Sequence, residues 1–411
     1  FTQADYKGAF GSDNWLDGLS ILSGSFNELD PGAISHCGSI SADETWSQAD
    51  AHVLTCQTFV ESGVTLTIEA GTTVKSLSDD GNGNAPAIVV WQGGMIEAVG
   101  TASAPIIMTS IIARDEPDRL PIVGGRAWGG LIICGYAPIQ GGGTRTVEGV
   151  ASVPYGGTDA ADDSGTLRYV SVRYGGRAIA PDNEINGITL AGVGTGTEVS
   201  YCEVAYNFDD GFEMFGGTVD LRYCMVYKVG DDGFDTDTGY QGTGQFLVVV
   251  RGATSNRGHE MDGRNSSQAA DDSFPKFSNV TIVGNNSGSS EDESLRLREG
   301  TAGHFQNYML VDQQRRGFRA TNEDGNLDGT FVVNGSTPPT NDADGRYIWL
   351  DPLNVMDDVP TPATVAATDG TDPGASFTFN VQDGNTGVTE ANLLPTTEFT
   401  GSTPTEASMD A

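Results

Sequence analysis

The carboxylates with the clearest chemical potential in this sequence stand in two turns that lie 22 residues apart. They are Asp209, Asp210, Glu213, Asp231, Asp232, Asp235 and Asp237. If the two turns stack on each other, like charges a few ångströms apart must protonate, move apart or bind a cation. Calcium accepts several oxygen ligands in flexible geometry, so we predict a calcium site here. In the alternative interpretation, one Asp of each pair caps its turn and the other faces water.

A second cluster combines a histidine with acidic and basic side chains. Its members His259, Glu260, Arg298 and Arg316 are candidate contacts for a glycan. A histidine beside carboxylates suits general acid–base chemistry, but Gly263 stands where a zinc-binding HExxH motif would place its second histidine. We therefore assign no catalytic residue. Ion pairs with neighbouring acids are the simpler alternative role for the arginines.

The elements that must position these side chains form an internal repeat. The segment YCEVAYNFDDGFEMFGGT from Tyr201 aligns without a gap with YCMVYKVGDDGFDTDTGY from Tyr223. Self-similarity at a period of about 20 to 30 residues is typical of a solenoid, in which each coil buries its apolar face only against its neighbours. The two acidic turns are therefore expected in adjacent coils.

Short runs with strand-like composition extend the repeat in both directions. They begin at Val64, Ala87, Ala104, Leu167, Phe246, Phe277 and Phe305. Runs rich in Val, Ile, Thr and Tyr between turn residues indicate strands, and no window shows the apolar period of a helix. We predict an all-β fold, a single-stranded right-handed parallel β-helix with a loop-rich N-terminal cap and a β-rich C-terminal extension.

The expected solenoid has flanks of different composition. Residues 1–60 are rich in loop-forming residues and are expected to cap the first coil, whereas residues 61–346 form the β-helix. Residues 347–411 contain no Lys or Arg. Because the open end of a solenoid exposes unpaired strand edges, this acidic segment is expected to cap the last coil or to serve assembly or attachment.

Four of the five cysteines have informative positions. Cys37 and Cys56 are 19 residues apart in a loop-rich segment, a spacing suited to a disulfide in an oxidising compartment. Cys202 and Cys224 occupy equivalent positions of adjacent coils, within disulfide reach of each other. Two buried thiols in an inward-facing ladder are the alternative for this second pair.

The charge of the chain limits its partners. Its net charge is −35, from 56 acidic and 21 basic residues. Such a surface repels phosphate, so we expect no nucleic-acid partner; solubility alone is the simplest explanation of the acidity. No run of 18 apolar residues occurs, so no membrane span is expected. The sequence begins at Phe1 without a signal-like segment, which indicates a processed chain or a fragment.

Several segments resemble a known family. VTLTIEAGTTVKS from Val64, WGGLIICGYAPI from Trp128 and FDDGFEMFGGTV from Phe208 are similar to segments of secreted right-handed β-helix proteins found on the outside of Gram-negative bacteria. The resemblance spans roughly residues 60 to 330. It implies the fold and an extracellular location at the bacterial cell surface, and it implies no activity.

Together these features favour a structural role. We expect a secreted, non-enzymatic structural or adhesive cell-surface protein that is stabilised by calcium and self-associates head-to-tail into a filament or layer. The alternative is a calcium-dependent polysaccharide lyase or hydrolase, or a glycan-binding β-helix, with a cell-surface polysaccharide as its partner. That alternative depends on analogy, because a fold does not determine a function.

Overall fold

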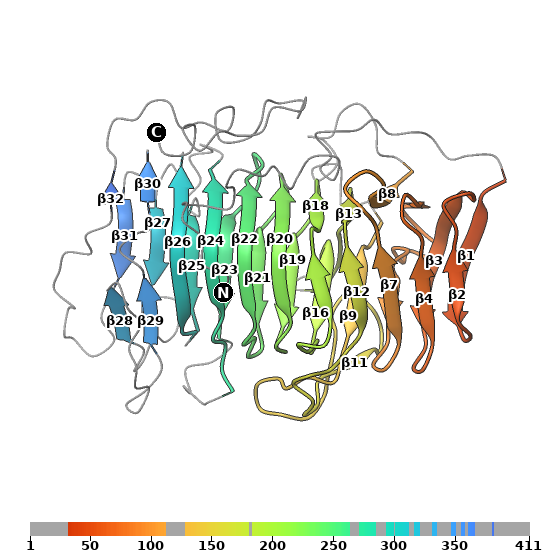
Figure 1. The fold of residues 1–411 in the computed structure, drawn as a ribbon, viewed down its shortest axis with the longest axis horizontal. Coiled ribbons are helices and arrows are strands. Elements are labelled where there is room, and N and C mark those ends of the chain that lie inside the picture. Colours follow the sequence, from red (N-terminus) through yellow and green to blue (C-terminus); the bar gives the residue numbers. More distant parts are fainter. Residues whose placement is uncertain are drawn as a thin grey trace.

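The chain winds into a long solenoid of stacked strands (Figure 1). This computed structural model describes residues 32–111, 128–180, 183–263, 271–284, 293–299, 301–311 and 316–320, and five short strands between residues 331 and 381. One sheet contains 28 strands, and all its pairings are parallel. The described residues form no helix, and hence none that is long and apolar enough to cross a membrane. The predicted all-β parallel β-helix is confirmed.

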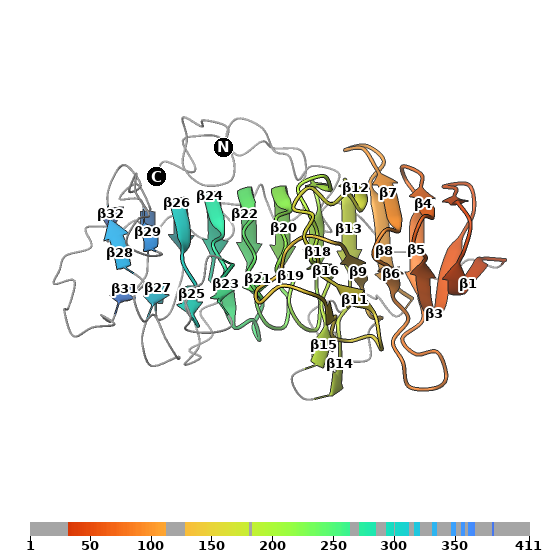
Figure 2. The same ribbon diagram turned by 90° about the horizontal axis from the view of Figure 1, so that it is seen from below.

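The strands form three parallel ladders, named here sheets A, B and C (Figures 1 and 2). Sheet A contains β2 (Glu44–Trp46), β4 (Thr65–Ile68), β7 (Met95–Val99), β12 (Gly165–Arg168), β17 (Glu198–Ser200), the first halves of β20 (Asp220–Tyr227), β22 (Thr243–Val250), β24 (Lys276–Val283) and β26 (Gly303–Val311), then β29 (Tyr347–Leu350) and β28 (Phe331–Asn334).

Sheet B contains the first parts of β1 (Ile34–Ile40) and β3 (His52–Val60), then β5 (Thr73–Ser76), β8 (Ile106–Ser110), β13 (Val170–Arg173), β18 (Glu203–Ala205), the second halves of β20, β22, β24 and β26, and β30 (Val355–Asp357) and β32 (Asn380–Val381).

Sheet C contains the last parts of β1 and β3, then β6 (Ile88–Val90), β9 (Leu131–Cys134), β16 (Ile188–Ala191), β19 (Phe212–Phe215), β21 (Phe234–Asp237), β23 (Arg257–Asp262), β25 (Glu293–Arg298), β27 (Arg316–Ala320) and β31 (Thr361–Val365). Two small antiparallel pairs stand outside the ladders: β10 (Arg145–Thr146) with β11 (Pro154–Tyr155), and β14 (Arg177–Ala180) with β15 (Asn183–Ile185).

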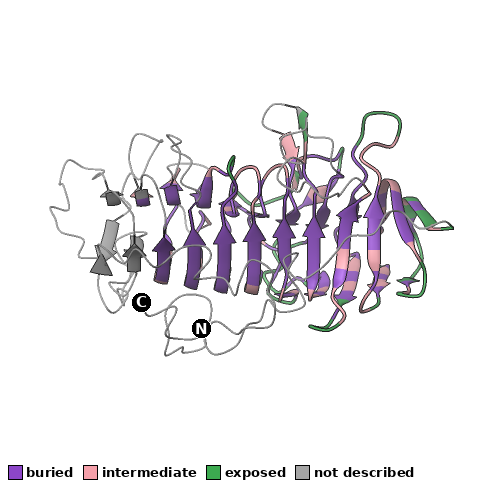
Figure 3. Cartoon of the chain, turned by 90° about the horizontal axis from the view of Figure 1, so that it is seen from above, coloured by how far each residue is buried: buried purple, intermediate pink, exposed green. Residues whose placement is uncertain are grey.

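Buried residues continue along the whole length of the described solenoid (Figure 3). Because strand side chains alternate between faces, an in-register parallel ladder places equivalent residues one above another. Leu167, Val199 and Leu221 form such a column in sheet A. In sheet C the rings of Phe212 and Phe234 stack with centroids 5.1 Å apart. Each coil therefore depends on its neighbours for burial.

The corner between sheets A and B is made by one residue in each of six successive coils. These residues have φ between 51° and 61°, in the left-handed region, and are Tyr169, Tyr201, Tyr223, Phe246, Asn279 and Asn307. This conformation costs roughly 1–2 kcal/mol for a non-glycine residue. The four aromatic rings stack at centroid distances of 4.5, 4.6 and 4.7 Å, which offsets part of that cost at roughly 0.5–1.5 kcal/mol per pair.

The ladders extend beyond the predicted boundaries at both ends. β1, β2 and β3 pair in parallel with later strands, so residues 34–60 build the first coils instead of a separate cap. At the other end, β29 to β32 pair in parallel and continue the solenoid after residue 346. The short strands of these segments lack the repeat's motif, which explains why the pattern did not include them.

The cysteines follow the geometry of the coils. Cys37 and Cys56 form a disulfide between β1 and β3, with their Cα atoms 4.8 Å apart. Cys202 and Cys224 are free and buried, so the disulfide alternative is not realised for this pair. Both side chains enter the apolar core from adjacent coils, and each thiol donates to a backbone carbonyl, that of Ser200 at 3.4 Å and that of Arg222 at 3.6 Å.

Candidate metal centre on the outer face of sheet C

The turn between sheets B and C explains the repeated Asp-Gly step. A Cβ atom on Gly211 would lie 2.5 Å from the carbonyl oxygen of Gly233, and one on Gly233 would lie 2.4 Å from that of Gly258. Glycine is therefore required for the coils to approach at this corner. The residue before each glycine joins one column across the coils, which consists of Asn186, Asp210, Asp232 and Arg257.

Five of the seven carboxylates predicted as metal ligands converge at this corner. Asp209, Asp210 and Asp231 form one group, and Asp210, Glu213 and Asp235 form another. Within each group, one oxygen per residue lies within 4.8 Å of the others. Asp210 belongs to both groups, so they form a single carboxylate cluster that spans two adjacent coils.

The carboxylate cluster strongly disfavours negative charge in the absence of a cation. Burial, followed by the charge of Asp231, raises the pKa of Asp209 to about 9. Burial also raises the pKa of Asp231 to about 7, although Arg257 opposes that shift. The pKa values of Asp210, Glu213 and Asp235 lie well above their usual range for the same two reasons, burial first and neighbouring carboxylates second. A divalent cation relieves this repulsion directly.

The hydrogen bonds within the carboxylate cluster leave oxygen atoms available. Asp235 Oδ1 is buried and has no hydrogen-bond partner in the described part of the chain. A buried carboxylate oxygen without a donor is costly unless a cation or water satisfies it. The donor set consists entirely of oxygens, the ligands that hard cations such as calcium and magnesium accept.

A further carboxylate joins the cluster from an insertion far away in the sequence. Glu148 lies between β10 and β11, where Val147, Val150 and Val153 pack in an apolar cluster with the outward-facing Ile132 of sheet C. The side-chain amide of Asn186 donates to Glu148 at 3.1 Å and to Glu213. Burial raises the pKa of Glu148 to about 7. No sequence motif indicates Glu148, whereas Asn186-Gly187 repeats the Asp210-Gly211 step one coil earlier.

Asp232 and Asp237 have other roles. The backbone N–H of Asp232 donates to Asp210 Oδ1 at 2.8 Å, while its own Oδ2 accepts from Arg257 at 3.3 Å. Asp237 accepts from the backbone N–H of Thr238 in its own turn. Neither belongs to the two groups described above. The carboxylate of Asp232 is buried against Arg257 and does not face water as the turn-capping alternative expects.

Along sheet C the outward-facing side chains change from acidic to basic. One column reads Glu213, Asp235, Glu260, Arg296 and Arg319 in successive coils. The arginines pair with buried acids: Arg257 with Glu260 at 2.7 Å, Arg298 with Asp262 at 2.6 Å and Glu260 at 3.2 Å, and both Arg296 and Arg319 with Glu293 at 3.2 and 2.9 Å. We name this self-neutralised region the arginine ladder.

The predicted glycan contacts are divided between this ladder and the core. Glu260 and Arg298 form an ion pair with each other, and Arg316 lies in β27 in register with Glu293. His259 is fully buried, with its ring edge-on to Phe234, Phe277 and Tyr308. It therefore cannot touch a glycan, because it takes the inward position that Phe234 holds one coil earlier. Aligning RGHEMD with DGFDTD would have predicted this.

The fold and these columns of side chains define a parallel β-helix protein in which the outer face of sheet C carries ionisable side chains. Residues 38–343 match the family described as pectate-lyase-like beta helix domain, and the chain belongs to that family. Neither the curated proteins nor the solved structures include a significant match. The family match ends at residue 343, between β27 and β31 of sheet C, and it includes the whole carboxylate cluster.

Proposed function

We propose that this protein is a calcium-stabilised, non-catalytic β-helix with a structural or adhesive role at the bacterial cell surface. The observation that carries the proposal is the carboxylate cluster, in which acids from adjacent coils meet while the nearby arginines are engaged with other acids. A bound calcium ion would join the two coils and the Glu148 insertion into one unit.

The accessibility of the cluster favours a structural ion over a catalytic one. Only 7% of Asp210 and 8% of Glu213 is exposed, whereas Asp209, Asp231 and Asp235 are partly exposed. An ion held mainly by the first two has little room for a substrate. Acid–base cleavage of a polysaccharide also needs a base that can reach the sugar, and each arginine of the arginine ladder already has a carboxylate partner. Both features support a role in stability.

Secretion and self-association are part of the proposal. The Cys37–Cys56 disulfide suits an oxidising, extracellular compartment. In the described residues, β1 and β2 each pair on one side only. An exposed edge can accept another strand, and a head-to-tail contact that does not close on itself produces a filament.

Cleavage of an acidic polysaccharide is the second candidate function. It is favoured by the family match and by the position of the carboxylate cluster beside the arginine ladder on one face. In such an enzyme a calcium ion would neutralise a uronate carboxylate and a basic group would remove the proton from the carbon beside it, while the bond from the next carbon to the glycosidic oxygen breaks and releases the leaving sugar.

One experiment separates the two candidates. We expect calcium to bind the full chain in isothermal titration calorimetry and to raise its unfolding free energy, by about 2.7 kcal/mol at a hundredfold excess over Kd. Polygalacturonate should yield no unsaturated product that is detectable by ultraviolet absorbance. Absence of both binding and stabilisation would overturn the calcium proposal, and a calcium-dependent absorbance increase would establish the second candidate instead.

A further inference from the structure

Sheet A has the most regular alternation of the three ladders. Its inward residues are apolar, as in Leu167, Val199 and Leu221, while its outward residues are mostly polar, with Met95 and Val99 as apolar exceptions on β7. One outward column reads Thr67, Glu97, Thr166, Glu198, Asp220, Thr243 and Lys276, and the next reads Arg168, Ser200, Arg222, Gln245 and Ser278. The face of sheet A thus presents hydrogen-bonding groups at the regular spacing of the strands.

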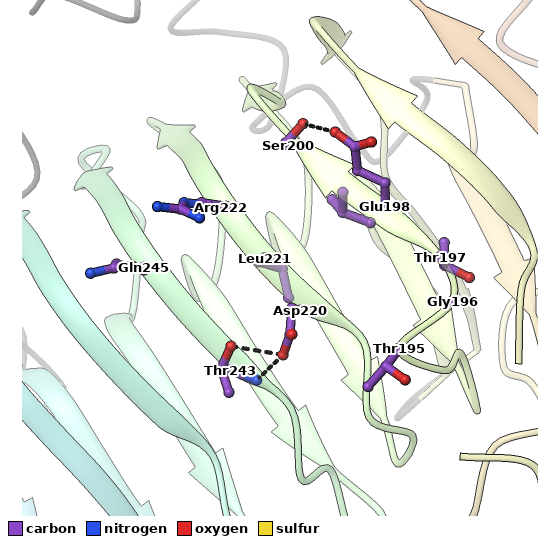
Figure 4. Close-up of a pocket in the computed structure, with 11 residues that line it drawn as sticks. Thr195, Gly196, Thr197, Glu198, Ser200, Asp220, Leu221, Arg222, Thr243 and Gln245 are labelled. Atoms are coloured by element: carbon purple, nitrogen blue, oxygen red, sulfur yellow. Dashed lines mark hydrogen bonds between the residues drawn. The ribbon is translucent and has the colours of Figure 1, made fainter. Parts of the chain in front are cut away.

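A depression of about 480 Å³ lies on this face (Figure 4). It crosses β17, β20 and β22 and includes the turn before β17. Its polar lining includes Thr195, Glu198, Ser200, Asp220, Arg222 and Gln245. The volume is within the range of roughly 300–1,000 Å³ found for small-molecule sites, and three coils of a rigid ladder hold its floor.

The lining groups are held in defined positions. Asp220 accepts hydrogen bonds from the backbone N–H of Thr243 at 2.9 Å and from its hydroxyl at 2.7 Å, and Ser200 donates to Glu198 at 2.6 Å (Figure 4). The guanidinium of Arg222 lies over the rings of Tyr223 and Phe246, 5.4 and 5.7 Å from their centroids. These contacts keep carboxylate acceptors and a guanidinium donor on one surface, an arrangement suited to vicinal hydroxyl groups.

The charge of the depression argues against an anionic ligand. Its lining contains two carboxylates, Glu198 and Asp220, and one guanidinium, and Glu198 is additionally paired with Arg168 outside it. The chain as a whole carries a net charge of −35, which repels polyanions over long distances. The corner aromatics stack face to face with each other, so a ligand here would be recognised mainly through hydrogen bonds.

We propose that the depression on sheet A binds a neutral saccharide, with Glu198, Asp220 and Arg222 contacting its hydroxyl groups. This would supply the ligand class for an adhesive role. The inference does not depend on calcium, because the depression and the carboxylate cluster lie on different sheets. It also differs from the predicted glycan contacts at His259, Glu260 and Arg298, which lie in the core or in the arginine ladder.

The test is calorimetric titration of the full chain, in EDTA and again in calcium, with cellohexaose, chitohexaose and hexagalacturonate. We expect saturable binding of a neutral hexasaccharide in both buffers and a loss of at least tenfold in affinity for Arg222→Ala and for Glu198→Gln. Asp50→Ala, an exposed change in the first coil, is the matched control and should bind normally.

Three results would overturn the inference: no binding of either neutral sugar, preference for hexagalacturonate, or neutral-sugar binding that is unchanged in both Arg222→Ala and Glu198→Gln. Unchanged thermal unfolding of the variants in circular dichroism distinguishes lost contacts from lost folding. Binding that persists in EDTA separates this result from the calcium proposal, so either idea can fail alone.

Discussion

Asp210 receives a hydrogen bond on its Oδ1 from the backbone N–H of Asp232, 22 residues later, at 2.8 Å. The same carboxylate belongs to both candidate ligand groups. One side chain therefore connects two adjacent coils and provides an oxygen to each half of the carboxylate cluster. Its importance can be tested directly, as can that of the residues around it.

Replacing Asp210 should affect calcium binding more than folding. Asp210→Asn keeps an acceptor for the Asp232 amide but removes the charge, so we expect calcium affinity to fall at least tenfold, a loss of about 1.4 kcal/mol or more. Calorimetry measures this, with Asp50→Asn as a surface control. Equal calcium affinity in Asp210→Asn and the unmodified protein would exclude the cluster as the site.

Replacing Glu148 tests whether the insertion between β10 and β11 participates in the calcium site. We expect Glu148→Gln to weaken calcium binding while leaving stability in EDTA nearly unchanged, because Asn186 can still bond to the new amide oxygen. Glu97→Gln, on the outer face of sheet A, should have no effect on affinity. If Glu148→Gln binds calcium as tightly as that control, the insertion is not part of the site.

Replacing Glu293 tests the arginine ladder. This carboxylate is fully buried and is the shared partner of Arg296 and Arg319. Removing one partner of a buried ion pair leaves an uncompensated charge, so Glu293→Gln should destabilise the protein by about 3–5 kcal/mol in urea unfolding. Glu198→Gln removes a half-exposed partner of Arg168 and should cost below about 1 kcal/mol. Similar losses for the two variants would contradict this account.

His259 should make stability depend on pH. Burial lowers its pKa from 6.5 to about 3, so the unfolded chain takes up a proton below about pH 6.5 while the folded chain does not until about pH 3. Its contribution to stability is therefore present above pH 6.5 and is lost as the pH falls, by roughly 2 kcal/mol at pH 5. His259→Phe, which extends the Phe212–Phe234 column, should lose less stability between pH 7 and pH 5. Identical losses in both proteins would count against the buried neutral histidine.

The repeat made the fold and much of the candidate site predictable. The gap-free alignment from Tyr201 to Tyr223 placed Asp209, Asp210 and Asp231 in adjacent coils, because parallel in-register stacking converts sequence period directly into proximity. The predictions from the repeat that were wrong have physical causes. His259 was misplaced because its coil departs from the 22-residue period, and in the inward column its Nδ1 lies 3.3 Å from the Tyr308 hydroxyl.

Other features of the site cannot be predicted from the period of the sequence repeat. Glu148 reaches the carboxylate cluster from an insertion whose apolar residues fold over sheet C. No local spacing in the sequence predicts that this insertion packs back onto the sheet. The pairing of Glu260 with Arg298 required knowing that β23 and β25 are in register. The depression on sheet A combines residues that are individually ordinary, and only the alignment of three coils brings them together.

The left-handed corner residues also determine where this molecule can be altered. Tyr201 and Cys202 alone separate β17 from β18, and β20 passes the same corner without interruption at Tyr223. From β12 to β26 that edge has a nearly constant length, whereas the first coils place longer connections there, at residues 47–51, 69–72 and 100–105. The insertions that carry the β10–β11 and β14–β15 pairs emerge at the other two edges. For protein engineering, a foreign peptide grafted at the exposed Gly141–Gly143 turn would be displayed without disturbing the ladders, whereas one grafted at Tyr201 would separate them.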